Sequence, residues 1–423
     1  MGVLNEANTV GVELERVLPK VKALFDRDDK FFSSIEKRPV EVISSRDMRI
    51  PLELRPGLNF GHWDPNGGDM GRGDGSVYDK AVISSVHFRG VCEQTTQSQW
   101  STDNSRKAVL NTFRDQLAKG LREFKRNLDS ACMTSGSGVL ATSSAVTAAG
   151  GTGGGDLWTL NVAGEGFNAR LLRFNLTVAI YDTTLATKRG EAKVNFYDGP
   201  NKIVHTLPAV AGVVAGDKLL ISGLSGASPT SLFGVPYHHS NSSSGTWLGF
   251  SRSTTPEIRA NRVNAAGSLA LPFPRRAINA MGDRVGEDVM EGQSVVAWMH
   301  RCQKQAYEEI GQLISQIHKA PKEEGLDLYF NDNMQMAGAP VKTSYSWDKT
   351  RIDFINAEYW GRAELHGLDF YKDQEGKRVF PVMGASGGLA AAWLFYFVTS
   401  WNLFHTCPAA GSYIDGLTIP TGY

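Results

Sequence analysis

The stretch GHWDPNGGDMGRGDGSVYDK, from Gly61 to Lys80, is dense in glycine and carries an aspartate at every fifth position from Asp64 to Asp79. Strand-like residues precede it (50–60), and the segment AVISSVHFRGV (81–91) follows it. This pattern predicts two strands joined by a long polar tip. At about 3.4 Å per residue the hairpin would reach ~35–40 Å, and an isolated two-stranded hairpin is only marginally stable in water. The sequence therefore predicts an extended loop that either folds back on its own domain or is covered by something else.

The aspartates of this stretch do not form a calcium loop of the EF-hand type, which needs a glutamate at position 12. Counted from the first three aspartates of the stretch, position 12 is Gly75, Lys80 or Ser85. The tripeptide Arg72-Gly73-Asp74 matches an adhesion motif, but tripeptides recur by chance and the N-terminus shows no secretory signal. We therefore expect the stretch to act through contacts and not through a bound metal.

Composition limits the classes that the chain can belong to. It has 423 residues, 41% hydrophobic and 21% charged, with 44 basic and 44 acidic side chains. This is a folded protein without a net field to hold nucleic acid. The apolar run from Leu389 to Phe404 is too short for a membrane span and predicts a buried strand. The four cysteines are far apart without zinc spacing, which predicts buried thiols of a cytosolic protein: Cys92, Cys132, Cys302 and Cys407.

Five further segments give the layout of the chain. Apolar residues at helical spacing predict an N-terminal helix (14–25) and a long amphipathic helix from Asp103 to Ser130, about 40 Å in length. Thr142 to Asp156 reads as a flexible linker. Short alternating strands follow, including RFNLTVAIYD (173–182), and predict a small barrel or sandwich inserted into the chain. The segment SVVAWMH (294–300) predicts a strand that leads into a helix from Cys302 to His318.

Each enzyme-like motif in this sequence lacks a part that its chemistry requires. The segment from Gly384 to Gly388 matches the pattern GxSxG, but the chain that remains is too short for the fold which that motif requires. The glycines at 150–155 lack the ending of a phosphate-binding loop. His238 and His239 lie in a polar segment without a third ligand and are interpreted as a surface pair. We predict no catalytic, cofactor-binding or metal-binding residue and no enzymatic activity.

The layout resembles that of the major capsid proteins of tailed bacteriophages, which share the Hong Kong 97-type fold. The segment from Arg49 to Val91 resembles the extended loop of that fold, and Asp103 to Ser130 its spine helix. SVVAWMHRCQKQAYEEIGQLI (294–314) is similar to a strand and helix of the axial domain. RAELHGLDFYKDQEGKRVFPVMGASGG (362–388) and SYIDGLTIPTGY (412–423) are similar to C-terminal strands of the peripheral domain. No residue matches the lysine–asparagine crosslink that some members form.

The resemblance implies an α+β Hong Kong 97-type capsid fold with an N-terminal arm, extended β-hairpin loop, spine helix, peripheral and axial domains, and an inserted small β-barrel-like domain. The expected boundaries are 1–45 for the arm, 46–98 for the extended loop, 99–160 for the peripheral domain with the spine helix, 161–225 for the inserted β domain, 226–364 for the axial domain and 365–423 for the C-terminal peripheral strands.

The implied function is a coat protein that assembles into pentamers and hexamers of an icosahedral shell around double-stranded phage DNA. Its location is the virion capsid, after assembly in the host cytoplasm. The implied partners are other copies of the chain, a portal, separate scaffolding or decoration proteins, and DNA packaged without sequence specificity; no membrane and no cofactor is implied. We expect the loop tip to contact a neighbouring subunit through Trp63, Asp64, Asp69, Arg72, Asp74 and Lys80.

Three alternatives remain open from the sequence. An encapsulin-like nanocompartment shell would share the fold. A receptor- or glycan-binding phage appendage would use the inserted β domain and exposed aromatic residues, and would be a trimer. A hydrolase would depend on Ser386.

Overall fold

The computed structural model describes residues 30–35, 41–42, 47–55, 57–62, 71–73, 75–96, 112–161, 171–198, 202–224, 229–286, 295–318, 334–384 and 387–420. The chain divides into two compact units. The first comprises residues 1–29, 88–126 and 368–399, and the second residues 30–87, 127–367 and 400–423. The helix predicted for 14–25 lies outside the described residues, as does most of the expected N-terminal arm.

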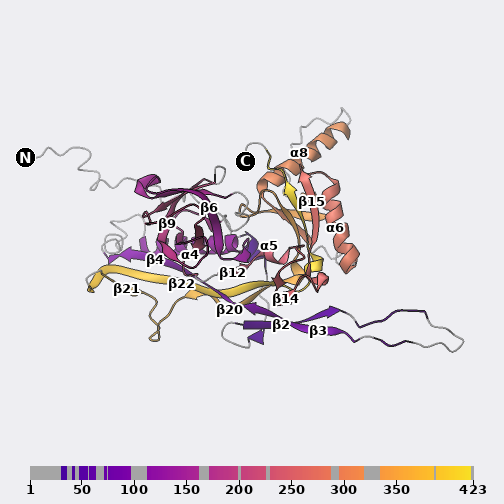
Figure 1. Ribbon diagram of the computed structural model, residues 1–423, viewed down its shortest axis with the longest axis horizontal. Helices are drawn as coiled ribbons and strands as arrows, with labels where there is room; N and C mark the ends of the chain where they lie inside the picture. The colour runs from indigo at the N-terminus through magenta and orange to yellow at the C-terminus, as the bar shows by residue number, and fades with distance from the viewer. Residues whose placement is uncertain are drawn as a thin grey trace, which may run out of the picture. The chain divides into compact units, whose positions relative to one another are not determined.

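The predicted hairpin is present in the second unit. Strands β1 (Glu41–Val42), β2 (Asp47–Arg55) and β3 (Val77–Ser84) form a sheet in that order. The β2–β3 pair is antiparallel, with Ile50 opposite Ala81 and Glu53 opposite Tyr78. In Figure 1 the strands β2 and β3 lie side by side. This confirms the hairpin and places the start of its second strand at Val77, four residues before the predicted one.

A four-stranded sheet and a long helix contribute residues to both units. Strands β20 (Trp360–Phe370), β22 (Leu389–His405) and β21 (Phe380–Met383) are neighbours in that order, and β4 (Val86–Thr95) also pairs with β22. The helix α4 (Thr112–Ala131) confirms the C-terminal part of the predicted 103–130 helix; residues 103–111 lie outside the described part. The Phe124 ring stacks on that of Phe397 at 6.0 Å, as expected for the apolar side of an amphipathic helix. The run from Leu389 forms the long strand β22, as predicted, but only its C-terminal half is buried, and Leu389 and Trp393 are exposed.

A closed β-barrel of six strands follows α4 in the chain. Its strands are neighbours in the order β10-β7-β6-β11-β8-β9 around the barrel. Their bounds are β6 Val139–Thr147, β7 Asp156–Leu160, β8 Thr177–Tyr181, β9 Lys188–Asp198, β10 Ile203–Leu207 and β11 Lys218–Ile221. The predicted small barrel is therefore present, and its first strand begins at Val139.

The flexible linker predicted for Thr142 to Asp156 is wrong. These residues form most of β6, a tight turn and the first residue of β7, and β6 and β7 pair antiparallel. The buried Asp156 carboxylate holds the turn, because its two oxygens accept backbone N–H groups of Ala149 and Val210 at 3.1 and 2.8 Å. A turn held by a buried carboxylate is fixed and not flexible.

The second unit also contains a six-stranded mixed sheet of the order β15-β23-β19-β16-β18-β17. The bounds are β15 Asn261–Gly267, β16 Val295–Met299, β17 Gln335–Met336, β18 Ala339–Thr343, β19 Ile352–Asn356 and β23 Ser412–Leu417. Helices α6 (Pro272–Val285) and α8 (Arg301–His318) pack on one face (Figure 1). Met281, Ala297 and Phe354 are fully buried in the core between them. The strand and helix predicted for 294–318 are confirmed.

Short elements complete the described part of the second unit. They are the helices α2 (Lys30–Ser34) and α5 (Val235–His238), and the strand pairs β5 (Ser135–Ser137) with β12 (Thr230–Phe233) and β13 (Thr246–Trp247) with β14 (Phe250–Ser251). Single 3-10 turns lie at Thr152–Gly154, Pro256–Ile258, Ala357–Tyr359 and Pro408–Ala410.

Candidate functional site

The base of the β2–β3 hairpin is anchored on its own unit. Met48 and Ile83 are buried against Trp247 and its neighbours in one apolar cluster. The backbone N–H of Val82 also donates to the carbonyl of Leu248 at 3.1 Å. The apolar side of the hairpin is thus covered at its base, which fixes the direction in which the strands leave the core.

The distal loop of the hairpin carries large apolar side chains that remain in solvent. Leu58 is 82% exposed and Phe60 is 87% exposed. The two branches of the loop hold each other, since Gly57 N–H donates to Ser76 Oγ at 3.0 Å. Gly71 has a φ of 74°, a left-handed conformation that favours glycine. Exposed leucine and phenylalanine side chains of this kind are a candidate contact surface.

The predicted contact residues of the tip are only partly described. Arg72 is exposed, and its carbonyl accepts the Asn59 Nδ2–H at 3.1 Å. Lys80 is exposed on β3, opposite Pro51. The other four, Trp63, Asp64, Asp69 and Asp74, lie outside the described residues. Sequence reasoning did not single out Leu58 and Phe60, because residues 50–60 were expected to form a strand, whereas β2 ends at Arg55. The available signal was the presence of apolar residues between Pro56 and Gly61.

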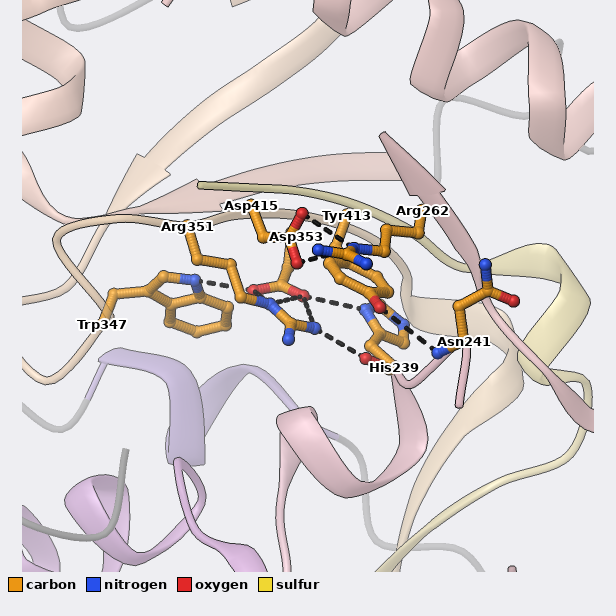
Figure 2. Close-up of polar contacts among 8 residues, drawn as sticks. All are labelled: His239, Asn241, Arg262, Trp347, Arg351, Asp353, Tyr413 and Asp415. Carbon is orange, nitrogen blue, oxygen red and sulfur yellow. Dashed lines mark hydrogen bonds and ion pairs between the residues drawn. The ribbon is translucent and has the colours of Figure 1, made fainter. Parts of the chain in front are cut away.

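A network of polar side chains around Asp353 is the second candidate site. It lies on the face of the six-stranded sheet away from α6 and α8 (Figure 2). The buried Asp353 carboxylate accepts hydrogen bonds from Arg351 (Nη2, 2.7 Å), Trp347 (Nε1, 3.0 Å) and His239 (Nδ1, 3.1 Å). Arg351 also donates to the carbonyl of His239 at 2.8 Å and lies 3.9 Å from the ring centroid of Tyr413. Burial is the largest single influence on the pKa of Asp353 and raises it, but the Arg351 charge and the hydrogen bonds from His239 and Arg351 together outweigh burial, so the pKa is lowered.

Further polar side chains lie on this same face of the sheet, which we call the polar face, along strand β23. Arg262 of β15 pairs with Asp415 at 2.8 Å, and both are part-exposed. The hydroxyl of Tyr413 accepts the backbone N–H of Asn241 at 3.2 Å (Figure 2). Because Tyr413 and Asp415 alternate with buried Ile414, β23 presents its polar residues to one face and its apolar residue to the helices.

The interpretation of His238 and His239 as a surface pair is wrong, because both side chains are 0% exposed. His238 Nδ1 accepts the indole N–H of Trp247 at 3.0 Å, so its proton lies on Nε2, which donates to the carbonyl of Leu403 at 3.3 Å. Burial lowers the pKa of His238 from 6.5 to about 3. Burial also lowers the pKa of His239, although the Asp353 carboxylate opposes it.

A buried aspartate that orients a histidine is a feature of hydrolytic triads, but this pair has no route to a substrate. His239 and Asp353 are fully buried, and each is held by neighbours that fix the fold. Within the described ranges, no three histidine, cysteine or acidic side chains lie close enough together to hold a metal ion. Ser386 of the GxSxG match lies outside the described residues. The described contacts of these polar side chains join the segment after α5 to β23 and to Asp353 of β19.

Two further findings concern the cysteines and the helices. The four cysteines are free thiols; Cys132 and Cys302 are buried, as predicted, whereas Cys92 and Cys407 are only half-buried. Among the helices that the structure describes, none combines the length and apolar character needed to cross a membrane.

The fold is that of the Hong Kong 97-type capsid proteins, in agreement with the sequence-based prediction. A capsid chain of cyanophage A-1(L) matches 98% of this chain over 100% of its own length, with a TM-score of 0.59 and 11% identity. The capsid of a native GTA particle matches with the same coverages, a TM-score of 0.50 and 10% identity. No protein-family model and no curated protein sequence matches. The similarity lies in the three-dimensional arrangement and is too distant in sequence to carry individual residues across.

Proposed function

We propose that this chain is a major capsid protein whose copies assemble as pentamers and hexamers of an icosahedral shell around double-stranded DNA. The observation that carries the proposal is the agreement in fold over nearly the whole of both chains with a cyanophage capsid chain. In a virion the partners would be other copies of the chain, a portal, and scaffolding or decoration proteins. The balanced charge of 44 basic and 44 acidic residues is consistent with packaged DNA that is enclosed and not bound by sequence.

The distal loop of the hairpin gives the proposal a physical basis. Leu58 and Phe60 are exposed on a single copy, and burying a side chain of this kind contributes about 1.5–3 kcal/mol. A neighbouring subunit would bury both, and the charged and aromatic residues of the tip (Trp63, Asp64, Asp69, Arg72, Asp74 and Lys80) would surround them as a polar rim. Since a closed shell repeats the contact at every subunit, a modest energy per contact suffices for assembly.

The test is electron microscopy of the purified chain together with a double variant, Leu58→Ser with Phe60→Ser. We expect shells from the unaltered chain, and from the variant a soluble, folded protein with at least a tenfold lower yield of shells. Phe174→Ser is the matched control, because this phenyl ring is 71% exposed on the barrel and not on the hairpin. Deletion of residues 67–75 should act like the double variant.

Normal shells from the double variant and from the deletion would refute the role of the loop. A chain that stays monomeric at high concentration would refute the capsid assignment itself. Shells with a protein cargo in place of DNA would favour the nanocompartment alternative, and a trimer that binds glycans would favour the appendage alternative.

A further inference from the structure

The helix α2 (Lys30–Ser34) is held by an aromatic socket. Phe31 is 1% exposed, and its ring meets three indoles edge to face. The centroid distances are 5.2 Å to Trp298, 5.2 Å to Trp347 and 6.4 Å to Trp360. Edge-to-face packing of this kind adds to the energy of burial. Phe31 is thus the side chain that fills the socket.

The socket also binds the backbone of α2. Asp129 of α4, itself buried, accepts the N–H groups of Phe31 and Phe32 on one oxygen at 2.9 Å each. Arg362 donates to the carbonyl of Phe32 at 3.3 Å, and its guanidinium lies 4.5 Å from the Phe32 ring centroid. Trp401 contacts the other phenylalanine ring at 5.2 Å. Two adjacent phenylalanines are therefore recognised through both their rings and their backbone.

The socket and the helix α2 differ in what stabilises each of them. The socket comes from α4, β16, β20, β22 and the segment that carries Trp347, all distant from α2 in the sequence and fixed by other contacts. The helix α2 has five residues, too few for a helix to be stable by itself. The socket can therefore exist without α2, whereas α2 depends on the socket. This is the relation of a binding site to a peptide ligand.

The fit around Phe31 leaves space. A cavity of about 60 Å³ lies between α2 and the sheet, with Ser34, Ile35, Val296 and Lys342 in its lining. Unfilled space beside a buried ring means lost dispersion contacts, so the segment is held less tightly than a close-packed one would be. Release and rebinding are correspondingly easier.

We propose that this socket is a binding site for the Phe31-Phe32 segment that accepts it from a second copy of the chain as well as from its own. Five residues (36–40) join Ile35 to Glu41 of β1, and they span at most about 20 Å. Exchange is therefore confined to copies in direct contact. Swapping an identical element in this way links subunits without any new type of contact. The proposal requires no shell and is tested on the soluble chain, so its outcome is separate from that of the capsid assignment.

The first experiment uses the full chain with Phe31→Ala, which leaves the socket without its ring, and a synthetic peptide of residues 28–36. We expect saturable binding, read by tryptophan fluorescence because Trp298, Trp347 and Trp360 line the socket. Wild-type chain should bind the peptide at least tenfold more weakly, since its own segment is present at about millimolar effective concentration. A peptide with alanine at position 31 should also bind at least tenfold more weakly.

The second experiment tests exchange between copies and retains a complete segment. Asp129→Lys disables the socket while leaving Phe31 in place, and Phe31→Ala disables the segment while leaving the socket. Native mass spectrometry of the mixed full-length variants should show a 1:1 complex that neither forms alone. Failure of the peptide to bind Phe31→Ala, equal binding of the alanine peptide, or a mixture that stays as two single chains would overturn the proposal.

Discussion

Acid should destabilise the folded chain through His238, and the size of the effect follows from its surroundings. The ring is fully buried, and the Trp247 N–H points at Nδ1, the atom that a second proton would occupy. The pKa is about 3 in the folded chain, against ~6.5 in an unfolded one. Between those two values the unfolded chain binds the additional proton, so the free energy of unfolding falls as pH falls. The loss begins below about pH 6.5 and reaches about 2 kcal/mol at pH 5 from this one group.

The measurement is urea unfolding of the dilute, unassembled chain at pH 7.5 and at pH 5, followed by tryptophan fluorescence. His239, whose pKa is also lowered by burial, adds to the loss in the same direction. Asp353 contributes little to the change between these two pH values. Its pKa is lowered in the folded chain, so its contribution to stability is lost only as the pH falls below the ordinary carboxyl value of 3.8. In His238→Gln the fall between the two pH values should be smaller by about 2 kcal/mol. His366→Gln, at an exposed position, is the control and should keep the wild-type fall; equal falls in all three proteins would refute the reasoning.

Three further substitutions test the packing, each by the midpoint of chemical unfolding. Gly411→Ala should lower the free energy of unfolding by about 1–3 kcal/mol, because the new Cβ would lie 2.3 Å from Nε2 of His239. Gly282→Ala is the control, because the new Cβ would meet open space in α6. It should raise the free energy of unfolding by up to about 1 kcal/mol. A loss at position 282 as large as that at 411 would contradict the steric argument. Val296→Ile adds one methyl group toward the cavity beside α2 and should stabilise by up to about 0.8 kcal/mol; a loss would mean that the cavity cannot accept it. Asp129→Asn weakens two charge-assisted hydrogen bonds to α2 and should lower the free energy of unfolding by about 1–2 kcal/mol. An unchanged midpoint would show that these backbone contacts do not stabilise the fold.

The parts of the fold that sequence could predict are those that local pattern specifies. The hairpin, the long amphipathic helix, the strand that leads into α8 and the long strand β22 each rest on the periodicity of neighbouring residues. The segment 142–156 failed because small residues and glycines look alike in a linker and in a tight barrel turn. What fixes that turn is Asp156, through the backbone of Val210, more than fifty positions away. No local pattern reports such a contact.

The two histidines failed for the same reason. In the sequence they stand among serines, asparagines and tyrosines, a composition typical of exposed loops. Their burial depends on Asp353 and Leu403, each more than a hundred positions away. The exposed Leu58 and Phe60 are the reverse case, since local apolarity suggests a core where the fold provides none in a single copy. In both cases, the histidine pair and the exposed pair Leu58 and Phe60, contacts between residues far apart in sequence or in different chains determine whether the side chain is buried.

The polar face of the six-stranded sheet explains how the sheet keeps one register. Along β19 the apolar residues Ile352 and Phe354 face α6 and α8, and a similar apolar surface would accept the helices in more than one position. Asp353 on the opposite face accepts bonds from three side chains at once: Trp347 and Arg351 of the loop before β19, and His239, which follows α5. A shift of β19 by one residue would turn that carboxylate into the apolar core without a partner, at a cost of several kcal/mol. Because a buried ion pair adds little net stability compared with apolar packing, the network selects one arrangement of the strands more than it strengthens the fold.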